Sequence, residues 1–539
     1  MAAHTEIERK YEVDDSAVMP KPDVLRESLA ATGSVVTAVV DAGTVELDAD
    51  YFDTSGAALA RHRIVVRRRR GGADEGWHVK RSPSTSPGIG DTVRLETQWP
   101  LTEGRVPDEL LDTLRVYVRD HPLVPVAKIH TTRSLIHIRG ADGAQLAEIA
   151  DDRVRASDAT TGTVRFWREW EVELLDGLAG GLAGEVDAPA AQAGGSALLD
   201  RVEQLLLAAG AHPASSSSKL ASALGRTSLS DADAGGTLRL KKSSPASEVL
   251  VPVLCRLVDE LCELDPRVRA DEPDSVHQMR TRIRRLRSLF ASYRDLFDRA
   301  VTDPVRVELA HLGEVLGHAR DAEVMRDRVR GLIADHSGSG ATFSVDEAKS
   351  LTAELEAGWI ADYDVAHAGV VAELNGTRYF RLLDRLDELA ALPPLAEGAD
   401  RPARDVVRLA LSRDTKKVFS AANVAELTAT EDERIEALHD VRKAAKRLRY
   451  AAEAVTKDDT AVFGGAVRDL GAAAEGIHDL LGEHRDGSIM QQHLRDAAAS
   501  SSRAFDHGVL FEIERHSAAL CLADYPAALK VLKGLRRSV

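Results

Sequence analysis

Cysteine and long hydrophobic runs are scarce in this sequence. It contains three cysteines, Cys255, Cys262 and Cys521, in 539 residues, without the even number or the spacing that disulfides and metal sites require. A reducing compartment is therefore expected. No apolar run approaches the roughly 20 residues that a membrane helix needs. These absences predict a soluble cytoplasmic protein.

Net positive charge is also absent. Asp and Glu number 86 against 70 Lys and Arg, which gives a formal net charge of -16. This balance argues against a general binder of nucleic acid or of anionic membranes, so any basic surface must be local. The length and the 44% hydrophobic content predict two or three domains with packed cores.

The chain divides into two regions of different periodicity. Up to about residue 175, runs such as "TVELDADYFDT" and "DTVRLETQWP" alternate polar and apolar residues, which predicts strands separated by turns. Beyond about residue 247, nearly every segment has helical periodicity. A stretch rich in Ser, Gly and Ala separates the two regions. We expect a β-rich domain at 1–212, a linker at 213–246 and an all-α domain at 247–530.

The helical region contains an internal repeat. "VHQMRTRIRRLRSLF" at 276–290 resembles "LHDVRKAAKRLRYAA" at 438–452, and "LGHARD" at 316–321 resembles "LGEHRD" at 481–486. The two markers occur in the same order and at nearly the same separation, which indicates a duplication. Two similar helical bundles are therefore predicted.

Each copy of the repeat carries a cationic stripe. Its positions advance by three, four and three residues, so its side chains share one face of a helix. The two stripes consist of His277, Arg280, Arg284 and Arg287, and of His439, Arg442, Lys446 and Arg449.

The stripes are suited to a polyanion. Like charges at this spacing repel one another, and a bound polyanion would remove that cost, with guanidinium groups fitting phosphate oxygens. A single stripe would more often be a solvated basic face, but its recurrence in both copies favours binding. Nucleic acid is the rival polyanion, yet no aromatic residues for base stacking interleave with the stripes.

The duplicated His-x-x-Arg helices resemble the CHAD domain, a family of paired helical bundles associated with polyphosphate binding. The resemblance covers roughly residues 247–530. It implies that the eight stripe residues line a basic groove or channel for long-chain polyphosphate.

Near the N-terminus, "HTEIERKYEV" places Glu6, Glu8 and Lys10 at every second position. In a strand these side chains share one face, which is either solvated or a site for metal and anion. "EWEVEL" repeats the pattern, with Glu171 and Glu173 on one face and apolar residues on the other. One closed sheet would bring such polar faces into a common interior.

These motifs resemble the CYTH family, the triphosphate tunnel metalloenzymes, over about residues 4–225. The markers, in chain order, are "EIERK", "YFDT", "VVRRRR", "WHVKR", "VRLET", "TTR", "AEIADD" and "EWEVEL". The resemblance implies eight antiparallel strands that close into a tunnel. With the helical half, the chain resembles two-domain CYTH–CHAD proteins, and the expected fold class is α+β.

The CYTH resemblance also assigns roles. The expected cofactor is a divalent metal, Mg²⁺ or Mn²⁺, and the expected catalytic residues are Glu6, Glu8 and Lys10. The implied metal ligands are Glu6, Glu8, Asp152, Glu171 and Glu173. The implied triphosphate-binding residues are Lys10, Arg67, Arg69, Lys80, Arg94 and Arg133. For each charged residue the alternative is a solvated strand face or a salt bridge.

We expect metal-dependent hydrolysis of inorganic tripolyphosphate in the tunnel, with long-chain polyphosphate as the partner of the helical domain. Two alternatives stay open. The chain could be a non-catalytic polyphosphate-binding protein associated with granules, or a triphosphatase or cyclase that acts on an organic triphosphate. Neither a membrane nor a nucleic-acid partner is expected.

Overall fold

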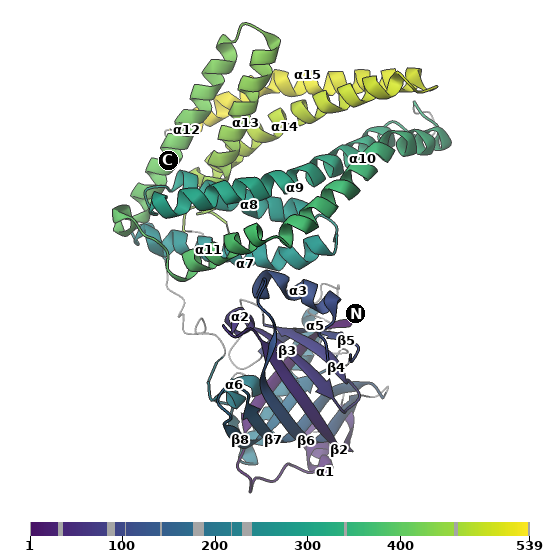
Figure 1. Cartoon of the computed structure of the whole chain (residues 1–539), viewed down its shortest axis with the longest axis vertical. Coiled ribbons are helices and arrows are strands. Elements are labelled where there is room, and N and C mark those ends of the chain that lie inside the picture. The colour runs from purple at the N-terminus through teal and green to yellow at the C-terminus, as the bar shows by residue number, and fades with distance from the viewer. Residues whose placement is uncertain are drawn as a thin grey trace. The chain divides into compact units, whose positions relative to one another are not determined.

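The computed structural model divides the chain into two compact units, Met1–Gly236 and Thr237–Val539 (Figure 1). The described residues are 2–30, 36–82, 92–102, 104–140, 143–175, 188–216, 218–228, 240–338, 342–457 and 462–536.

The first unit is a closed antiparallel barrel. Its strands are β1 (Ala2–Glu12), β2 (Val36–Asp53), β3 (Ile64–Arg70), β4 (Gly76–Arg81), β5 (Thr92–Trp99), β6 (Val124–Gly140), β7 (Gln145–Asp158) and β8 (Val164–Leu174). The sheet order is β5-β4-β3-β2-β6-β7-β8-β1, and pairing of β1 with β5 closes it. A two-residue strand, β9 (His212–Pro213), pairs with β1. The predicted eight-stranded tunnel is confirmed.

Alternation along the strands separates the interior of the barrel from its exterior. On β8, Trp170 and Val172 point outward and are almost fully buried in a core that includes Leu25 of α1 (Pro22–Ala30) and Val202 of α5 (Ala188–Ala208). Two further helices of this unit are α2 (Ala58–Arg61), which contacts β3, and α3 (Asp108–Val118), which contacts α2. Because the apolar residues of β8 pack on the outside of the barrel, the glutamates that alternate with them face inward.

A short helix, α6 (Lys219–Ala223), packs against inward-facing residues of the barrel. The Ser218 side chain caps it by accepting from the Ala221 backbone N–H at 3.2 Å. Leu220 and Ala223 share a core with residues of β2, β6 and β7. This segment was expected to be part of the linker, but residues 213–228 lie in the first unit, and only 217 and 229–239 fall outside the described residues.

The second unit is helical and duplicated. Its helices are α7 (Ala246–Arg269), α8 (Ser275–Ser292), α9 (Arg299–Ala334), α10 (Val345–Leu374), α11 (Thr377–Ala391), η3 (Glu397–Asp400), α12 (Ala403–Leu427), α13 (Glu431–Glu453), α14 (Ala466–Ala498) and α15 (Ala504–Leu535). The packing order α7–α8–α9–α10 recurs as α12–α13–α14–α15. The predicted duplication is confirmed.

The stripe helices α8 and α13 occupy equivalent places in the two copies and contact each other. α13 begins with a capping box formed by Thr430 and Glu433. Met279 and Ile283 on α8, like Val441 and Ala445 on α13, are fully buried. Burial of these apolar faces leaves the intervening basic residues on the remaining surface of each helix.

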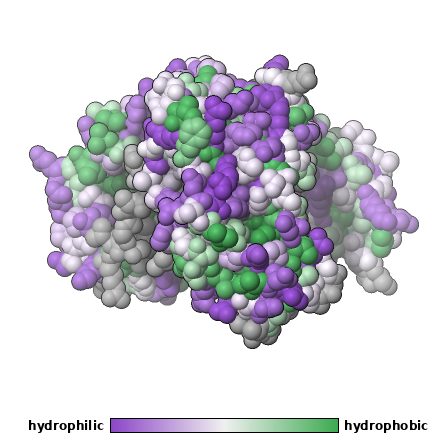
Figure 2. Space-filling view, turned by 90° about the horizontal axis from the view of Figure 1, so that it is seen from below, coloured by the Kyte–Doolittle hydropathy of each residue, from purple (hydrophilic) through white to green (hydrophobic). Residues whose placement is uncertain are grey.

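Within the described residues, no helix is long and apolar enough to cross a membrane. On the face shown in Figure 2, hydrophobic residues occur in small groups among hydrophilic ones.

Candidate functional site

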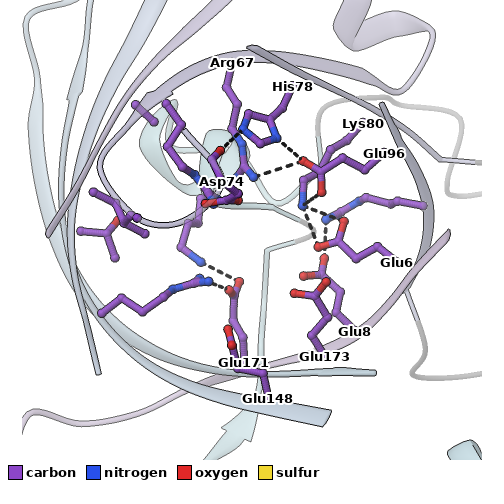
Figure 3. Close-up of a pocket in the computed structure, with 18 of the residues that line it drawn as sticks. Glu6, Glu8, Arg67, Asp74, His78, Lys80, Glu96, Glu148, Glu171 and Glu173 are labelled. Atoms are coloured by element: carbon purple, nitrogen blue, oxygen red, sulfur yellow. Dashed lines mark hydrogen bonds and ion pairs between the residues drawn. The ribbon is translucent and has the colours of Figure 1, made fainter. Parts of the chain in front are cut away.

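The barrel encloses a cavity of about 510 Å³ whose lining contains many charged side chains (Figure 3). Ten of the eleven residues predicted for the tunnel line it. These are Glu6, Glu8, Lys10, Arg67, Arg69, Lys80, Arg94, Arg133, Glu171 and Glu173. The eleventh, Asp152, has no exposed surface and lies behind Arg133.

The strand register places Glu6, Glu8 and Lys10 of β1 next to charged residues of β5 and β8. Glu8 on β1 lies opposite Glu173 on β8, and Lys10 lies opposite Glu171. On the other side of β1, Glu6 lies opposite Arg94 of β5. Directly opposed residues in an antiparallel pair have neighbouring side chains. Closure of the barrel therefore places carboxylates and cations from distant segments on one wall.

The predicted metal ligands separate into two groups. Asp152 and Glu171 lie with Glu169 in the one cluster of three carboxylates, among the described residues, whose oxygens lie within 4.8 Å of one another. Lys219 of α6 fills this cluster. Its ammonium lies 2.9 Å from Asp152, 2.6 Å from Glu169 and 2.6 Å from Glu171.

Two more cations reach the same cluster. Arg133 donates to both oxygens of Asp152, at 2.8 and 2.7 Å, and to Glu171 at 2.6 Å, while Lys10 forms an ion pair with Glu171. Burial disfavours the ionised form of Glu171, but Lys10, Lys219 and Arg133 outweigh it and hold its pKa well below its usual range. Three cations thus face three carboxylates, and the cluster carries little uncompensated charge.

The second group is Glu6, Glu8 and Glu173. Lys80 contacts both oxygens of Glu6 at 2.6 Å, and Arg94 forms an ion pair with Glu8. Burial alone would raise the pKa of Glu8, but Lys10 and Arg94 lower it to about 2.

Glu173 differs from its neighbours because it makes no ion pair with any described residue. Burial and the charges of Glu6 and Glu8 raise its pKa to about 8. Figure 3 shows these three glutamates together on one side of the tunnel. A negative charge on Glu173 is uncompensated there, so this group lacks one positive charge.

Cations gather on the β3 side of the tunnel. Arg69 pairs with Asp74, yet burial and repulsion from Arg67 and Arg133 lower the pKa of its guanidinium. Arg67 lies 3.3 Å from Glu96, which also accepts from His78 at 2.8 Å. Arg67, Arg69 and Arg133 therefore lie close together on this side of the tunnel, each with a carboxylate partner.

These two groups of side chains fit a metal with a phosphate chain. Hard divalent cations prefer carboxylate oxygens, which Glu6, Glu8 and Glu173 supply. Arginine and lysine bind phosphate oxygens through charged hydrogen bonds, which the β3 side of the tunnel offers.

The inward face of β2 is apolar. Val45, Leu47, Ala49 and Tyr51 alternate along the cavity wall, with Leu135 of β6 beside them. This wall offers surface that an inorganic phosphate chain does not use.

In the second unit, the central residues of the two stripes converge. Burial and repulsion from Arg280 and Arg442 lower the pKa of Arg284 to about 10. Burial and repulsion from Arg284, Arg442, Arg280 and Arg449 lower the pKa of Lys446 to about 5. Such shifts require several cations close together without enough anions.

The ends of the stripes have other surroundings. Arg449 contacts Glu475 at 2.6 Å and Glu453 at 2.8 Å, and the pKa of Arg287 is lowered by burial and by Arg306 of α9 rather than by the other stripe. His277 and His439 have lowered pKa values because of burial and neighbouring arginine or lysine. The convergent part of the stripes is thus Arg280, Arg284, Arg442 and Lys446.

Sequence reasoning missed Lys219, Asp74 and His78 as tunnel residues, and it did not select Glu169 as a possible ligand. The signal for Glu169 and His78 was present, since they share strand parity with Glu171 and Lys80. Lys219 lies in a Ser-rich stretch, and Asp74 lies in the turn after β3, where no periodicity marks orientation.

Comparisons with known proteins match both halves of the chain. The CYTH domain matches residues 4–179 and the CHAD domain residues 252–495. The uncharacterized protein Rv2226 of Mycobacterium tuberculosis (strain ATCC 25618 / H37Rv) is 35% identical over 565 residues, covering 100% of this chain and 98% of that protein.

Solved structures show weaker similarity. The CHAD domain from the plant Ricinus communis is 22% identical with a TM-score of 0.38, and the match covers 56% of this chain and 96% of that one. HpAC1 from Hippeastrum is 16% identical with a TM-score of 0.24, and the match covers 41% of this chain and 96% of that one.

Proposed function

Because this chain belongs to the two-domain CYTH–CHAD proteins, we propose that its tunnel hydrolyses inorganic tripolyphosphate with a divalent metal and that its helical unit binds long-chain polyphosphate. One observation carries the enzymatic proposal. Glu173 makes no ion pair with any described residue, and Arg67, Arg69 and Arg133 gather on the other side of the cavity, so the tunnel is suited to a cation and an anion together.

We assign the metal, Mg²⁺ or Mn²⁺, to Glu6, Glu8 and Glu173. The CYTH resemblance grouped Asp152 and Glu171 with them, but these two carboxylates already hold Lys219, Arg133 and Lys10, whereas Glu173 makes no ion pair with any described residue. Their proposed role is to orient those cations. Bound there, the metal would supply Lewis-acid stabilisation of phosphate oxygens and lower the pKa of a water molecule.

The basic residues fix the substrate. Arg67, Arg69 and Arg133 face the cavity from β3 and β6, and Lys10, Lys80 and Arg94 face it from the carboxylate side. Guanidinium and ammonium groups in these positions hold the triphosphate oxygens and stabilise the charge that moves during phosphoryl transfer. The buried setting strengthens these interactions because little water screens them.

Polyphosphate binding by the helical unit rests on the repulsion among Arg280, Arg284, Arg442 and Lys446. Burial, together with the neighbouring arginines, lowers the pKa of Lys446 to about 5 and disfavours its charged form. A polyanion between α8 and α13 would relieve this repulsion and allow Lys446 to be protonated again. The four remaining stripe residues, His277, Arg287, His439 and Arg449, would extend the contact.

Phosphate release from tripolyphosphate by the purified full chain, with and without Mg²⁺ or Mn²⁺, tests the tunnel proposal. We expect metal-dependent release that EDTA abolishes. No release with either metal, together with retained polyphosphate binding, would instead support the non-catalytic polyphosphate-binding protein.

The apolar wall of β2 favours a second candidate, an organic triphosphate. Val45, Leu47 and Leu135 could contact a nucleoside or another organic group attached to the phosphate chain. Parallel assays with tripolyphosphate and ATP separate the two substrates. A higher kcat/KM for ATP, or formation of cyclic AMP, would replace the inorganic substrate by an organic one.

A further inference from the structure

A glycine recurs at the same place in both copies of the helical repeat. Gly317 lies in "LGHARD" on α9, and Gly482 lies in "LGEHRD" on α14. Both are buried in the middle of long helices, where glycine is less favourable than alanine because its backbone loses more freedom. The recurrence of an unfavourable residue at equivalent positions calls for a packing reason.

In the first copy, the reason is Arg280. A Cβ atom at Gly317 would lie 3.1 Å from Nη2 of Arg280 and 3.5 Å from its Cζ. One turn farther along α9, Asp321 accepts from Nη1 of Arg280 at 3.2 Å. Residues four apart share one face of a helix. The guanidinium therefore lies on the face of α9 that the glycine leaves bare, next to a carboxylate.

The second copy repeats this arrangement with Arg442. A Cβ atom at Gly482 would lie 3.1 Å from Nη2 of Arg442 and 3.2 Å from its Nε. Asp486, one turn along α14, is the anion that acts most strongly on the Arg442 guanidinium. The two seats thus consist of Gly317 with Asp321 and of Gly482 with Asp486.

Glycines elsewhere in α9 and α14 have different surroundings. A Cβ atom at Gly331 of α9 or at Gly476 of α14 would meet no described atom within 4 Å. A Cβ atom at Gly487 of α14 would lie 3.3 Å from Nη2 of Arg328, but that arginine is paired with Glu514 and is not a stripe residue. Among the described glycines of α9 and α14, close approach to the guanidinium of a stripe arginine is thus seen at Gly317 and Gly482.

We infer that Gly317 and Gly482 are positioning residues that hold Arg280 and Arg442 against α9 and α14, so that both guanidinium groups stay directed at one polyanion. This inference rests on the proposed polyphosphate binding and deepens it. Without the seats, mutual repulsion would drive the two arginines away from Arg284 and Lys446, and the ligand would have to pull them back. Fixing them in advance removes that cost from binding.

The test compares alanine substitutions at seat and control glycines. Gly317→Ala/Gly482→Ala should weaken binding of long-chain polyphosphate about fivefold, because misplaced guanidinium groups lose charged hydrogen bonds. The dependence of log Kd on log salt should also become shallower, since fewer phosphates are neutralised. Gly331→Ala/Gly476→Ala should leave both quantities unchanged. Thermal unfolding should show that neither pair destabilises the protein.

A double-mutant cycle separates positioning from general disturbance of the helices. Gly317→Ala should have no further effect on affinity once Arg280→Ala is present, because the seat acts only through that arginine. An equal loss in both backgrounds, or an equal loss with the control pair, would overturn the inference. Absence of polyphosphate binding by the wild-type chain would overturn the proposed function and this inference with it.

Discussion

The tunnel and the basic cluster between α8 and α13 both bury charged side chains, but they differ in how these charges are compensated. In the tunnel, cations and carboxylates alternate, and burial of Lys219 is outweighed by Asp152, Glu169 and Glu171, which raise its pKa. Between α8 and α13, cations gather with few anions, and the pKa of Lys446 falls to about 5. One buried lysine is held charged and the other is held neutral.

This difference indicates which kind of ligand each site favours. A neutralised network is stable without a ligand and accepts a metal and a phosphate chain as a balanced pair. A cluster of like charges is destabilised without a ligand and gains from any polyanion of suitable shape. The tunnel is therefore suited to selective chemistry, and the helical unit is suited to retention of a polymer.

The largest effect should follow removal of carboxylates from the tunnel. Glu6→Gln/Glu8→Gln deletes two charges from the proposed metal site and should lower metal-dependent phosphate release from tripolyphosphate about 1,000-fold. The exposed Glu109→Gln on α3 is the control and should keep full activity. If the variant kept activity within tenfold of wild type, these residues would not be the metal ligands.

Lys219→Met should break the balance of the neighbouring cluster. Three buried carboxylates would lose a shared cation, which should lower the free energy of unfolding of the first unit by about 3 kcal/mol at pH 7. Chemical denaturation of the full chain measures this change, with the exposed Lys241→Met as the control. Equal stability of the two variants would show that Lys219 does not compensate the cluster.

In the helical unit, removal of positive charge should weaken polyphosphate binding and leave phosphate release in the tunnel unchanged. Arg284→Ala/Arg442→Ala should weaken long-chain polyphosphate binding about 50-fold at low salt, because two charged hydrogen-bond donors are lost. The exposed pair Arg408→Ala/Arg468→Ala should have a much smaller effect. Comparable losses for the two pairs would indicate general charge attraction rather than a site.

The smallest effect should appear in the pH dependence of polymer binding. Arg284, Arg442, Arg280 and Arg449 surround Lys446, and without ligand its pKa is about 5. A bound polyanion raises that pKa, so binding takes up a proton at pH values between 5 and the raised value. Affinity should therefore fall as pH rises through this window, by at most about tenfold per pH unit.

Lys446→Arg should flatten this pH profile because arginine stays protonated across the range. Titration calorimetry between pH 6 and 8, in buffers of different ionisation enthalpy, measures the proton uptake directly. A profile that is the same in wild type and variant would assign the pH dependence to another group.

Residues on regular elements could be predicted from the sequence. Period-two alternation oriented Glu6, Glu8 and Lys10. The resemblance to the CYTH family selected the eleven tunnel residues, and ten of them line the cavity. Helical spacing placed the two basic stripes on α8 and α13, and their recurrence indicated the duplication. The orientation of strand residues, the stripes and the duplication depend on patterns within the chain, which one sequence displays, whereas the choice of tunnel residues depended on the family resemblance.

Features that depend on long-range packing could not be predicted. Lys219 reaches the tunnel because Leu220 and Ala223 pack into the barrel, and a Ser-rich stretch shows no sign of this. The division of the carboxylates into a compensated cluster and a site at Glu173 depends on which cations arrive from other strands. The seats at Gly317 and Gly482 likewise depend on neighbouring helices.

The most direct measurement assays both activities on two variants. Phosphate release from tripolyphosphate and binding of long-chain polyphosphate would be measured for Glu6→Gln/Glu8→Gln and for Arg284→Ala/Arg442→Ala. We expect the first variant to lose hydrolysis and keep polymer binding, and the second to lose polymer binding and keep hydrolysis. Loss of both activities in either well-folded variant, or metal-dependent hydrolysis that survives in the first, would contradict the assignment of two separate sites.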